Sequence, residues 1–160
     1  MITESTMKIE NGNKVWRNKQ GQLHRLDGPA FEHADGTKRW YQNGQLHRLD
    51  GPAIEYTDGT KRWYQNGQLH RLDGPAVEHA HANGSKEWYQ KNQLHRDDGP
   101  AVEHADGSKA WYFEGKQYHA VLCFRKGQTI TKKPIESKTE AYKMMCDNLS
   151  KGICSWVEPL

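Results

Sequence analysis

The sequence predicts an all-β protein: an elongated antiparallel β-hairpin repeat array, a single-layer meander or solenoid, followed by a small C-terminal α+β cap. Three observations support this prediction. A ten-residue motif recurs along the chain, two turn signals flank each copy, and large aromatic residues are frequent in an otherwise polar sequence. We assign residues 1–119 to an array of about five 23-residue repeats and residues 120–160 to the cap.

Internal repetition is the strongest of these signals. GQLHRLDGPA occupies residues 21–30, 44–53 and 67–76, and the variant NQLHRDDGPA occupies residues 92–101. Trp recurs with the motif at positions 16, 40, 63, 88 and 111. Self-similarity at a period of roughly 20–50 residues is typical of repeat architectures, in which each unit packs on its neighbours.

The composition indicates a thin fold without a single deep core. Hydrophobic residues make up only 34% of the chain and the mean hydropathy is -1.05, but there are six Trp and seven Tyr. Disordered chains lack such large aromatics, which bury the most area per residue. We therefore expect small buried patches that repeat along an extended molecule.

Two turn signals frame each strand. Asn43-Gly44 and Asp35-Gly36 are both typical of two-residue hairpin turns. The intervening segment, residues 37–42, has the length and residue types of a strand. Pro52 cannot donate a ladder hydrogen bond, so it should mark a bend, a bulge or a strand break.

Counting outward from two-residue loops predicts the register. Trp40 should face His47 and Tyr41 should face Leu46, while Phe31 faces Trp40 and Glu32 faces Arg39 as an ion pair. One sheet face would then carry Phe31, Trp40 and His47, and the other would carry Ala30, Tyr41 and Leu46. Both faces hold an aromatic residue, so the sequence leaves open which is more buried. The third unit gains two residues around 79–82, an even number that should keep every side chain on its face.

The repeat is similar to a known family. Trp40, Gly44, His47, Gly51 and Gly59, at this spacing, resemble the MORN repeat over about residues 7–119. The usual Gly-x-Gly after the His is replaced by Arg-Leu-Asp-Gly-Pro, as in the divergent variant of bacterial and phage proteins. The resemblance implies stacked hairpins in an elongated antiparallel sheet. It also implies protein–protein interaction, with lipid binding proposed for some members, and no catalysis.

The C-terminal segment should cap the array. Residues 121–124 are expected to form a final strand, and residues 127–131 a turn with a short strand. The capping box Ser137-Lys138-Thr139-Glu140 predicts a helix over about residues 138–150, with Gly152 as its stop. This helix would cover the open sheet edge. The alternative is a docking helix or an oligomer contact.

No enzyme signature stands out from the repeats. The His24-Arg25-x-Asp27 tetrad resembles the catalytic loop of kinases, but it recurs four times without a Gly-rich nucleotide loop. A catalytic site is used once, so we interpret the tetrad as structural, with His beside Trp, Arg in a surface ion pair and Asp-Gly in a turn. The sequence also lacks a P-loop and a dinucleotide fingerprint. We expect no enzyme activity and no catalytic residues.

Metal and cofactor sites are also not expected. Equivalent His residues of neighbouring units should lie about 9–10 Å apart, two strands away. Two ligands of one zinc ion, each at ~2.1 Å, must approach within about 4 Å of each other. His79 and His81 point the same way, but no third ligand is evident.

Charge divides the chain into two parts. Residues 1–114 hold 15 Lys and Arg against 16 Asp and Glu, and residues 115–160 hold 8 against 4. The Arg ladder of the array is compensated by neighbouring Asp, which disfavours nucleic-acid binding there. Binding of nucleic acid through the basic tail remains an alternative.

Cysteine use and hydropathy favour a cytoplasmic location. Cys123, Cys146 and Cys154 are odd in number and form no CxxC pair, so we expect reduced thiols. The N-terminus lacks the pattern of a signal peptide. No apolar run approaches the ~18 residues of a membrane span, so no membrane contact is expected.

We therefore expect a non-enzymatic protein–protein interaction module. The resemblance adds a narrower expectation, a phage-encoded inhibitor of a host enzyme or defence complex. A specific partner needs features that occur once, and these lie in the C-terminal half. The predicted partner-binding residues are Lys132, Lys133, Lys138, Lys143, His79, His81, Tyr118 and His119. The alternative is a small-ligand or enzymatic site at the junction of array and cap, among Tyr112, Phe113, Tyr118, His119 and Cys123.

Overall fold

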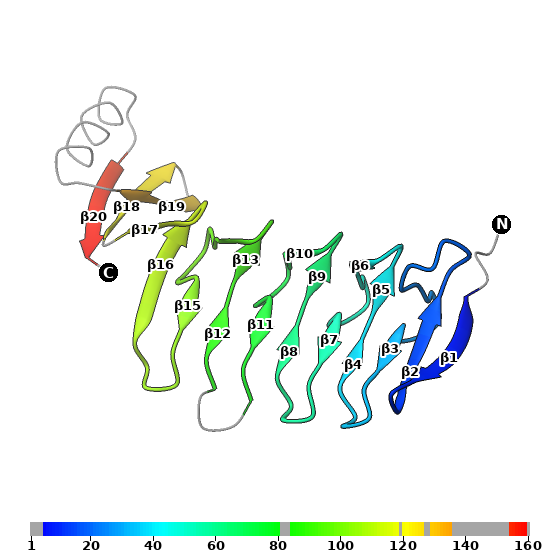
Figure 1. Ribbon diagram of the computed structural model, residues 1–160. Helices are drawn as coiled ribbons and strands as arrows, with labels where there is room; N and C mark the ends of the chain where they lie inside the picture. Colours follow the sequence, from blue (N-terminus) through cyan, green and yellow to red (C-terminus); the bar gives the residue numbers. More distant parts are fainter. Residues whose placement is uncertain (1–4, 81–83, 119, 127–128, 136–153, 160) are drawn as a thin grey trace.

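The protein forms an elongated antiparallel sheet whose strands follow one another in sequence order (Figure 1). The computed structural model describes residues 5–80, 84–118, 120–126, 129–135 and 154–159, with the backbone alone from Tyr118 onward. The predicted all-β hairpin meander is confirmed for the array. Within the described ranges there is no helix.

The array consists of one long sheet and three two-stranded ladders. The main eleven-stranded sheet runs in the order β1 (Thr6–Glu10), β2 (Asn13–Arg17), β3 (Phe31–Glu32), β4 (Lys38–Arg39), β7 (Ile54–Glu55), β8 (Lys61–Arg62), β11 (Val77–Glu78), β12 (Lys86–Glu87), β15 (Val102–Glu103), β16 (Lys109–Phe113) and β17 (Lys116–Tyr118). Two-stranded ladders join β5 (Tyr41–Gln42) to β6 (Gln45–Leu46), β9 (Tyr64–Gln65) to β10 (Gln68–Leu69) and β13 (Tyr89–Gln90) to β14 (Gln93–Leu94).

The turn at Asn43-Gly44 has the predicted form. Both residues have positive φ, 49° and 79°, as a two-residue hairpin loop of this hand requires. Tyr41 faces Leu46 across it, and the His47 N–H donates to the Trp40 carbonyl at 3.1 Å. This part of the predicted register is confirmed.

The turn at Asp35-Gly36 was predicted wrongly. The His33 N–H donates to the Thr37 carbonyl at 2.8 Å, so the loop has three residues, not two. Gly36 takes the left-handed position, with a φ of 97°, that such a three-residue loop needs. The extra residue shifts the pairing by one, and Phe31 faces Arg39 rather than Trp40.

The shift exchanges residues between the two faces. Trp40 is paired with an alanine and not with Phe31. Its N–H donates to the Ala53 carbonyl at 2.8 Å. The predicted Glu32–Arg39 ion pair is wrong, because Glu32 faces Lys38 and its carboxylate lies 3.2 Å from Lys14 Nζ. Trp therefore alternates with Ala across the strands, and Ala30, Ala53, Ala76 and Ala101 are all completely buried.

The third unit keeps this register despite its two extra residues. Val77 faces Glu87 and Glu78 faces Lys86, in the same pairing as Phe31 with Arg39. The prediction that an even insertion preserves the faces is confirmed.

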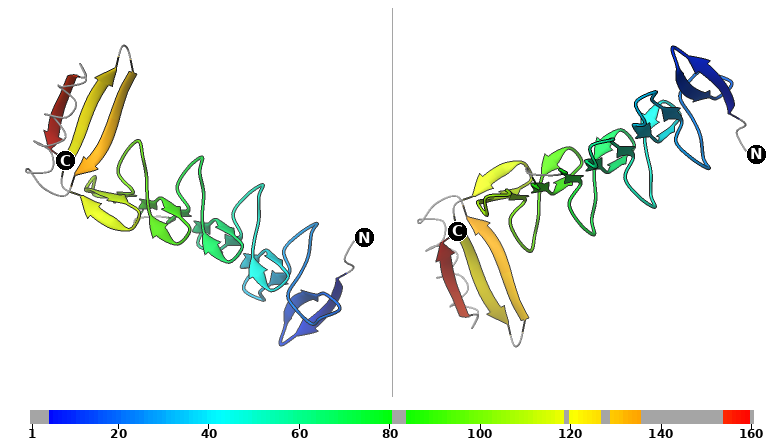
Figure 2. Two further views of the ribbon diagram at one scale, coloured as in Figure 1. Left: turned by 90° about the horizontal axis from the view of Figure 1, so that it is seen from above. Right: turned by 90° about the horizontal axis from the view of Figure 1, so that it is seen from below.

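Between β6 and β7 the chain leaves the sheet as a loop, residues 47–52. Both ends of this loop are bonded to Trp40, which accepts from His47 and donates to Ala53. The predicted break at Pro52 is therefore confirmed. Figure 2 shows one projecting loop per unit on one side of the array. We call these four loops, residues 24–29, 47–52, 70–75 and 95–100, the loop ridge.

A half-buried guanidinium group holds each loop in place. The Cζ atom of Arg48 lies 4.1 Å from the centre of the Trp40 ring. Its Nε donates to Asp50 at 2.9 Å, and its Nη1 donates to the Pro52 carbonyl at 3.2 Å and to Glu55 at 3.0 Å. The expected ion pair of the Arg with a neighbouring Asp is confirmed, and the Arg also stacks on the Trp ring. We call this arrangement the Arg cage; Arg25, Arg71 and Arg96 stack in the same way on Trp16, Trp63 and Trp88.

The glycine of the Asp-Gly-Pro segment completes the cage. A Cβ atom on Gly51 would lie 2.9 Å from Arg48 Cζ, inside the closest approach of such atoms. Glycine is needed here because the guanidinium group occupies the space of a side chain.

Consecutive units are tied by three hydrogen bonds from one Leu-His-Arg segment. The N–H groups of Asn43 and Gly44 donate to His24 Nδ1 at 3.1 Å and to the Leu23 carbonyl at 2.8 Å. The Arg25 N–H donates to the Tyr41 carbonyl at 3.1 Å. The later junctions repeat this set, so each turn is positioned by the preceding unit.

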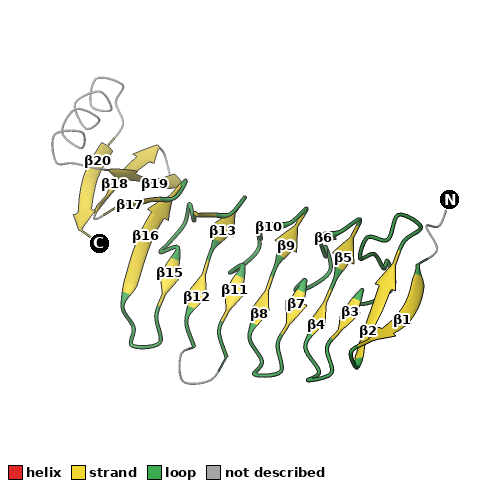
Figure 3. Ribbon diagram, in the orientation of Figure 1, coloured by secondary structure: helices red, strands yellow, loops and turns green. Residues whose placement is uncertain are grey.

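A separate three-stranded sheet follows the array, in the order β19 (Thr129–Ile135), β18 (Ala120–Lys126) and β20 (Cys154–Pro159) (Figure 3). The predicted strand at 121–124 is confirmed and is longer than expected. β20 was not predicted. The helix predicted over residues 138–150 lies outside the described residues.

The Arg cage predicts a strong coupling between Gly51 and Arg48. Gly51→Ala should destabilise the protein by about 1–2 kcal/mol, because the added methyl group displaces the guanidinium from its hydrogen bonds. In an Arg48→Ala background the same change should cost almost nothing. Urea unfolding of the four proteins gives the coupling energy. Equal losses in both backgrounds would contradict the cage.

Candidate functional site

The tips of the loop ridge expose a row of leucines. Leu26, Leu49 and Leu72 are 59%, 75% and 76% exposed, although they are large apolar side chains. The fourth loop carries Asp97 at the same position. An apolar residue recurring at the tip of a projecting loop differs from singly scattered surface residues, which need no explanation.

The leucines are exposed because the neighbouring Arg takes the inward position. In the second loop, the Arg48 side chain turns under the loop into its cage, and Leu49 is left at the tip. Asp50 beside it is held by Arg48 Nε while its carboxylate remains 84% exposed. The loop is therefore fixed by its own hydrogen bonds, which lowers the entropy lost on binding a partner.

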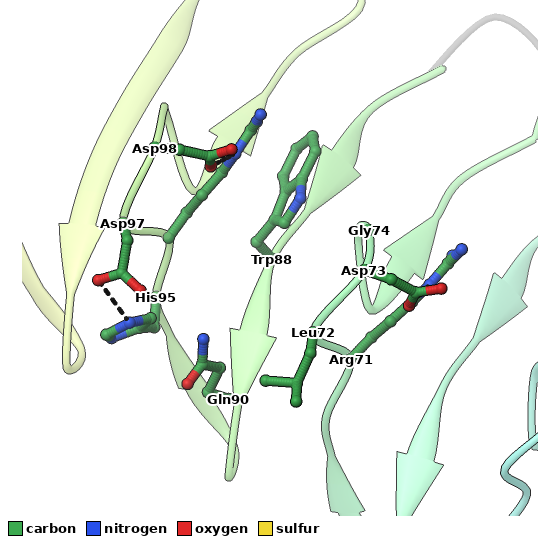
Figure 4. Close-up of a pocket in the computed structure, with 10 residues that line it drawn as sticks. Arg71, Leu72, Asp73, Gly74, Trp88, Gln90, His95, Asp97 and Asp98 are labelled. Atoms are coloured by element: carbon green, nitrogen blue, oxygen red, sulfur yellow. Dashed lines mark hydrogen bonds and ion pairs between the residues drawn. The ribbon is translucent and has the colours of Figure 1, made fainter. Parts of the chain in front are cut away.

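A groove of about 500 Å³ separates the third and fourth loops. In Figure 4 the Leu72 side chain points toward Gln90, and Asp97 extends toward His95 on the opposite wall, with Trp88 between the two loops. The groove is lined by Arg71, Leu72, Asp73, Gly74, Trp88, Gln90, His95, Arg96, Asp97 and Asp98.

Carboxylates outnumber cations in this groove. Asp73 and Asp98 accept from the Nε atoms of Arg71 and Arg96, and these hydrogen bonds lower the pKa of both carboxyl groups. Asp97 adds a third carboxylate, 3.3 Å from His95 Nε2. The Nη1 atoms of both Arg residues are also bonded to glutamates, so the cations are already compensated.

The predicted partner-binding residues lie on separate parts of the molecule. His79 is half-buried at the end of β11, with Nε2 3.3 Å from Glu87 Oε1. Lys132 and Lys133 lie on β19, an outer strand of the C-terminal sheet, and Tyr118 pairs with Trp111 in the main sheet. The remaining predicted residues, His81, His119, Lys138 and Lys143, lie outside the described residues.

Two residues of the alternative junction site have structural contacts in the array. The Phe113 ring centre lies 4.6 Å from that of His95. The Tyr112 carbonyl accepts from the Arg96 N–H at 3.2 Å. Both residues therefore connect the fourth unit to the fifth.

The leucines of the loop ridge are visible in the sequence, but the repetition of the motif hides their meaning. Leu49 is an isolated apolar residue between Arg48 and Asp50, in a segment that reads as a turn. Because it recurs identically in three units, the sequence alone does not distinguish it from the residues that recur for packing. Only the inward position of Arg48 shows that the leucine points outward.

Among the residues with described positions, no three His, Cys, Asp or Glu side chains are placed to hold one metal ion. A search of the same residues finds no helix of the length and hydropathy that crossing a membrane requires. The chain matches no protein-family model, no curated protein and no solved structure.

The ion pairs of the ridge predict a pH dependence. The hydrogen bond from Arg48, with its charge, lowers the pKa of Asp50. A depressed pKa means that Asp50 stabilises the fold above its ordinary pKa of about 3.9, and that this contribution is lost as pH falls further. Asp50→Asn should lower the urea midpoint at neutral pH and flatten its decline below about pH 4.

The control for this experiment is the same substitution in an Arg48→Ala protein, where the partner is missing. There the Asn variant should follow the parent at every pH. A decline below pH 4 that is identical with and without Asp50 in the Arg48 protein would show that this pair makes no contribution.

Proposed function

We propose that this protein is a non-enzymatic scaffold that binds another protein along the loop ridge. The observation that carries the proposal is the row of exposed leucines on loops that are fixed by the Arg cages. Aligned apolar side chains on an otherwise polar surface are typical of protein interaction sites. The resemblance to the MORN repeat supports the same class of function.

The surface favours a partner with apolar residues and a basic side chain. Leu26, Leu49 and Leu72 offer apolar contacts along the ridge. The groove at Leu72 offers the carboxylates of Asp73, Asp97 and Asp98, which complement a Lys or Arg of the partner. Burial of apolar area would supply affinity, and the carboxylates would supply orientation.

The groove also contains a feature that occurs once. Asp97 stands where the other three loops have Leu, so the ridge changes from apolar to acidic at its C-terminal end. A repeated surface alone would allow a partner to slide by one unit. We infer that Asp97 fixes the register of the partner, and that the C-terminal lysines Lys132 and Lys133 add long-range attraction for acidic parts of it.

The resemblance to the phage-type repeat variant leads to a narrower proposal. The partner would be a host enzyme or defence complex, and the rigid ridge would inhibit it by covering a functional surface. Loss of the partner's activity on addition of stoichiometric protein, with recovery when the leucines are replaced, would support this role.

Replacing the leucines tests the proposed surface. The triple variant Leu26→Asp, Leu49→Asp and Leu72→Asp should fold normally, because these side chains are exposed, and should lose binding by at least about a hundredfold, since buried apolar contacts at an interface become charges. Tagged protein is used to capture a stoichiometric partner from cell extract. The affinity of the purified pair is then measured by calorimetry.

The matched control places the same three charges at the other end of the strands. Ala34, Thr57 and Ala105 are exposed in the three-residue turns, so Ala34→Asp, Thr57→Asp and Ala105→Asp should leave binding within about twofold. Equal loss in both variants would reject the ridge as the site. Recovery of a bound small molecule or nucleic acid instead of a protein would reject the proposed function.

A further inference from the structure

The sheet face opposite the loop ridge carries a row of side chains aligned across the strands. Direct pairing places Arg39, Ile54, Arg62, Val77 and Glu87 at equivalent positions on β4, β7, β8, β11 and β12. Paired residues of an antiparallel sheet point to the same face. Glu55, the neighbour of Ile54 on β7, points the other way and accepts from Arg48 of a loop, so this row lies on the face away from the loops (Figure 2), which we call the open face.

Arg39 and Arg62 differ from every other Arg with a described side chain. Arg17 pairs with Glu10, and each cage Arg pairs with an Asp and lies near a Glu. Within the described part of the chain, Arg39 and Arg62 have no carboxylate within ion-pair distance. The Nε atoms of both are buried without a hydrogen-bond partner. An unsatisfied buried donor is costly, and the same one occurs in two consecutive units.

Tyrosines flank the two arginines on this face. Tyr41 and Tyr64 follow Arg39 and Arg62 two residues later, so they point to the same side. The Tyr56 ring lies 5.5 Å from Arg62 Cζ. All of these side chains are half-buried, so parts of each are reachable from solvent, although the two Nε atoms are not. Arg and Tyr are the residues most enriched where proteins bind one another.

We propose that the open face of the first two units binds an extended acidic segment of a partner protein. A carboxylate of the segment would accept from the Nη atoms of each guanidinium, because the Nε atoms are buried and out of its reach. The tyrosines would then contact the segment between its carboxylates. This surface is distinct from the loop ridge, so the inference does not depend on the proposed function.

The spacing of the arginines specifies the segment. Arg39 and Arg62 are two strands apart in the sheet, about 9–10 Å. A polyproline II segment rises ~3.1 Å per residue and has three residues per turn, which places every third side chain on one side, about 9 Å apart. The favoured ligand therefore has acidic residues three positions apart in an extended, proline-containing segment. Such segments are commonly bound on aromatic surfaces.

Nucleic acid fits this face less well. The positive positions end after two units, because Glu87 takes the place of Arg in the third unit and Ala110 in the fourth. A phosphate backbone requires an uncompensated positive track along its length. A short acidic segment needs only the two arginines.

The test uses a fluorescein-labelled peptide, (Glu-Pro-Pro)4, and the full-length protein. Anisotropy at low salt should detect binding, and a peptide of the same composition with its four Glu residues contiguous should bind several-fold more weakly. Arg39→Gln with Arg62→Gln should weaken binding of the spaced peptide by about tenfold or more, since two charge-assisted contacts are lost.

The matched control is Lys38→Gln with Lys61→Gln. These lysines are the immediate neighbours of the two arginines in β4 and β8, so they carry the same charge but point to the other face. Binding should change by less than about threefold. In the opposite direction, Glu87→Arg extends the row into the third unit and should strengthen binding several-fold.

Three results would overturn the inference. The first is equal loss in the Arg and Lys variants, which would mean a response to net charge. The second is no binding of the spaced peptide at millimolar protein, with circular dichroism confirming the fold. The third is tighter binding of a single-stranded oligonucleotide of the same charge, which would assign the face to nucleic acid. The ridge variant with three Asp substitutions should bind the peptide normally, which separates this outcome from that of the proposed function.

Discussion

Each repeat is organised around one guanidinium group that stacks on an indole ring. Trp40 supplies the ring, Gly51 leaves space on the loop, and Asp50, Glu55 and the Pro52 carbonyl accept the hydrogen bonds of Arg48. Five positions of the repeat thus contact or accommodate one cation, which explains why they recur with so little change. Because Arg48 turns inward, Leu49 turns outward, so the same contact that closes each unit also creates its exposed surface.

The sheet is thin, and its stability depends on small contacts that repeat. Ala53 is completely buried next to Trp-bearing strands, and Ile54 is nearly so among the long side chains of the open face. Among the side chains that the structure describes, the buried ones form only small patches, in agreement with the low apolar content of the sequence. Each unit instead draws on its neighbour through the Leu-His-Arg hydrogen bonds, as expected for a one-dimensional array.

The fold class and the period could be predicted because the motif recurs at a fixed spacing. The turn at Asn43-Gly44 could be predicted because positive φ at two consecutive residues has a narrow sequence signature. The register at Asp35-Gly36 could not, because Asp-Gly also suits a three-residue loop and the two differ by a single hydrogen bond, His33 to Thr37. That one residue exchanges Phe31 and Ala30 between faces. The unpaired Arg39 could not be predicted for the same reason, because it follows from the face that the residue occupies. The exposed leucines could not be predicted because they depend on Arg48 turning inward within its loop.

The hydrogen bonds between units have a consequence for how the chain can change in length. Every unit presents the same acceptors, the Leu23 carbonyl and His24 Nδ1 in the first case, and receives the same donors from the turn that follows. Even where Lys91-Asn92 replaces Asn-Gly, the backbone keeps its positive φ values and the contact survives. Units with matching ends are interchangeable, so duplication or deletion of one 23-residue module would lengthen or shorten the molecule by a fixed step. The length of the array can therefore change during evolution without a change in the surface chemistry of each unit.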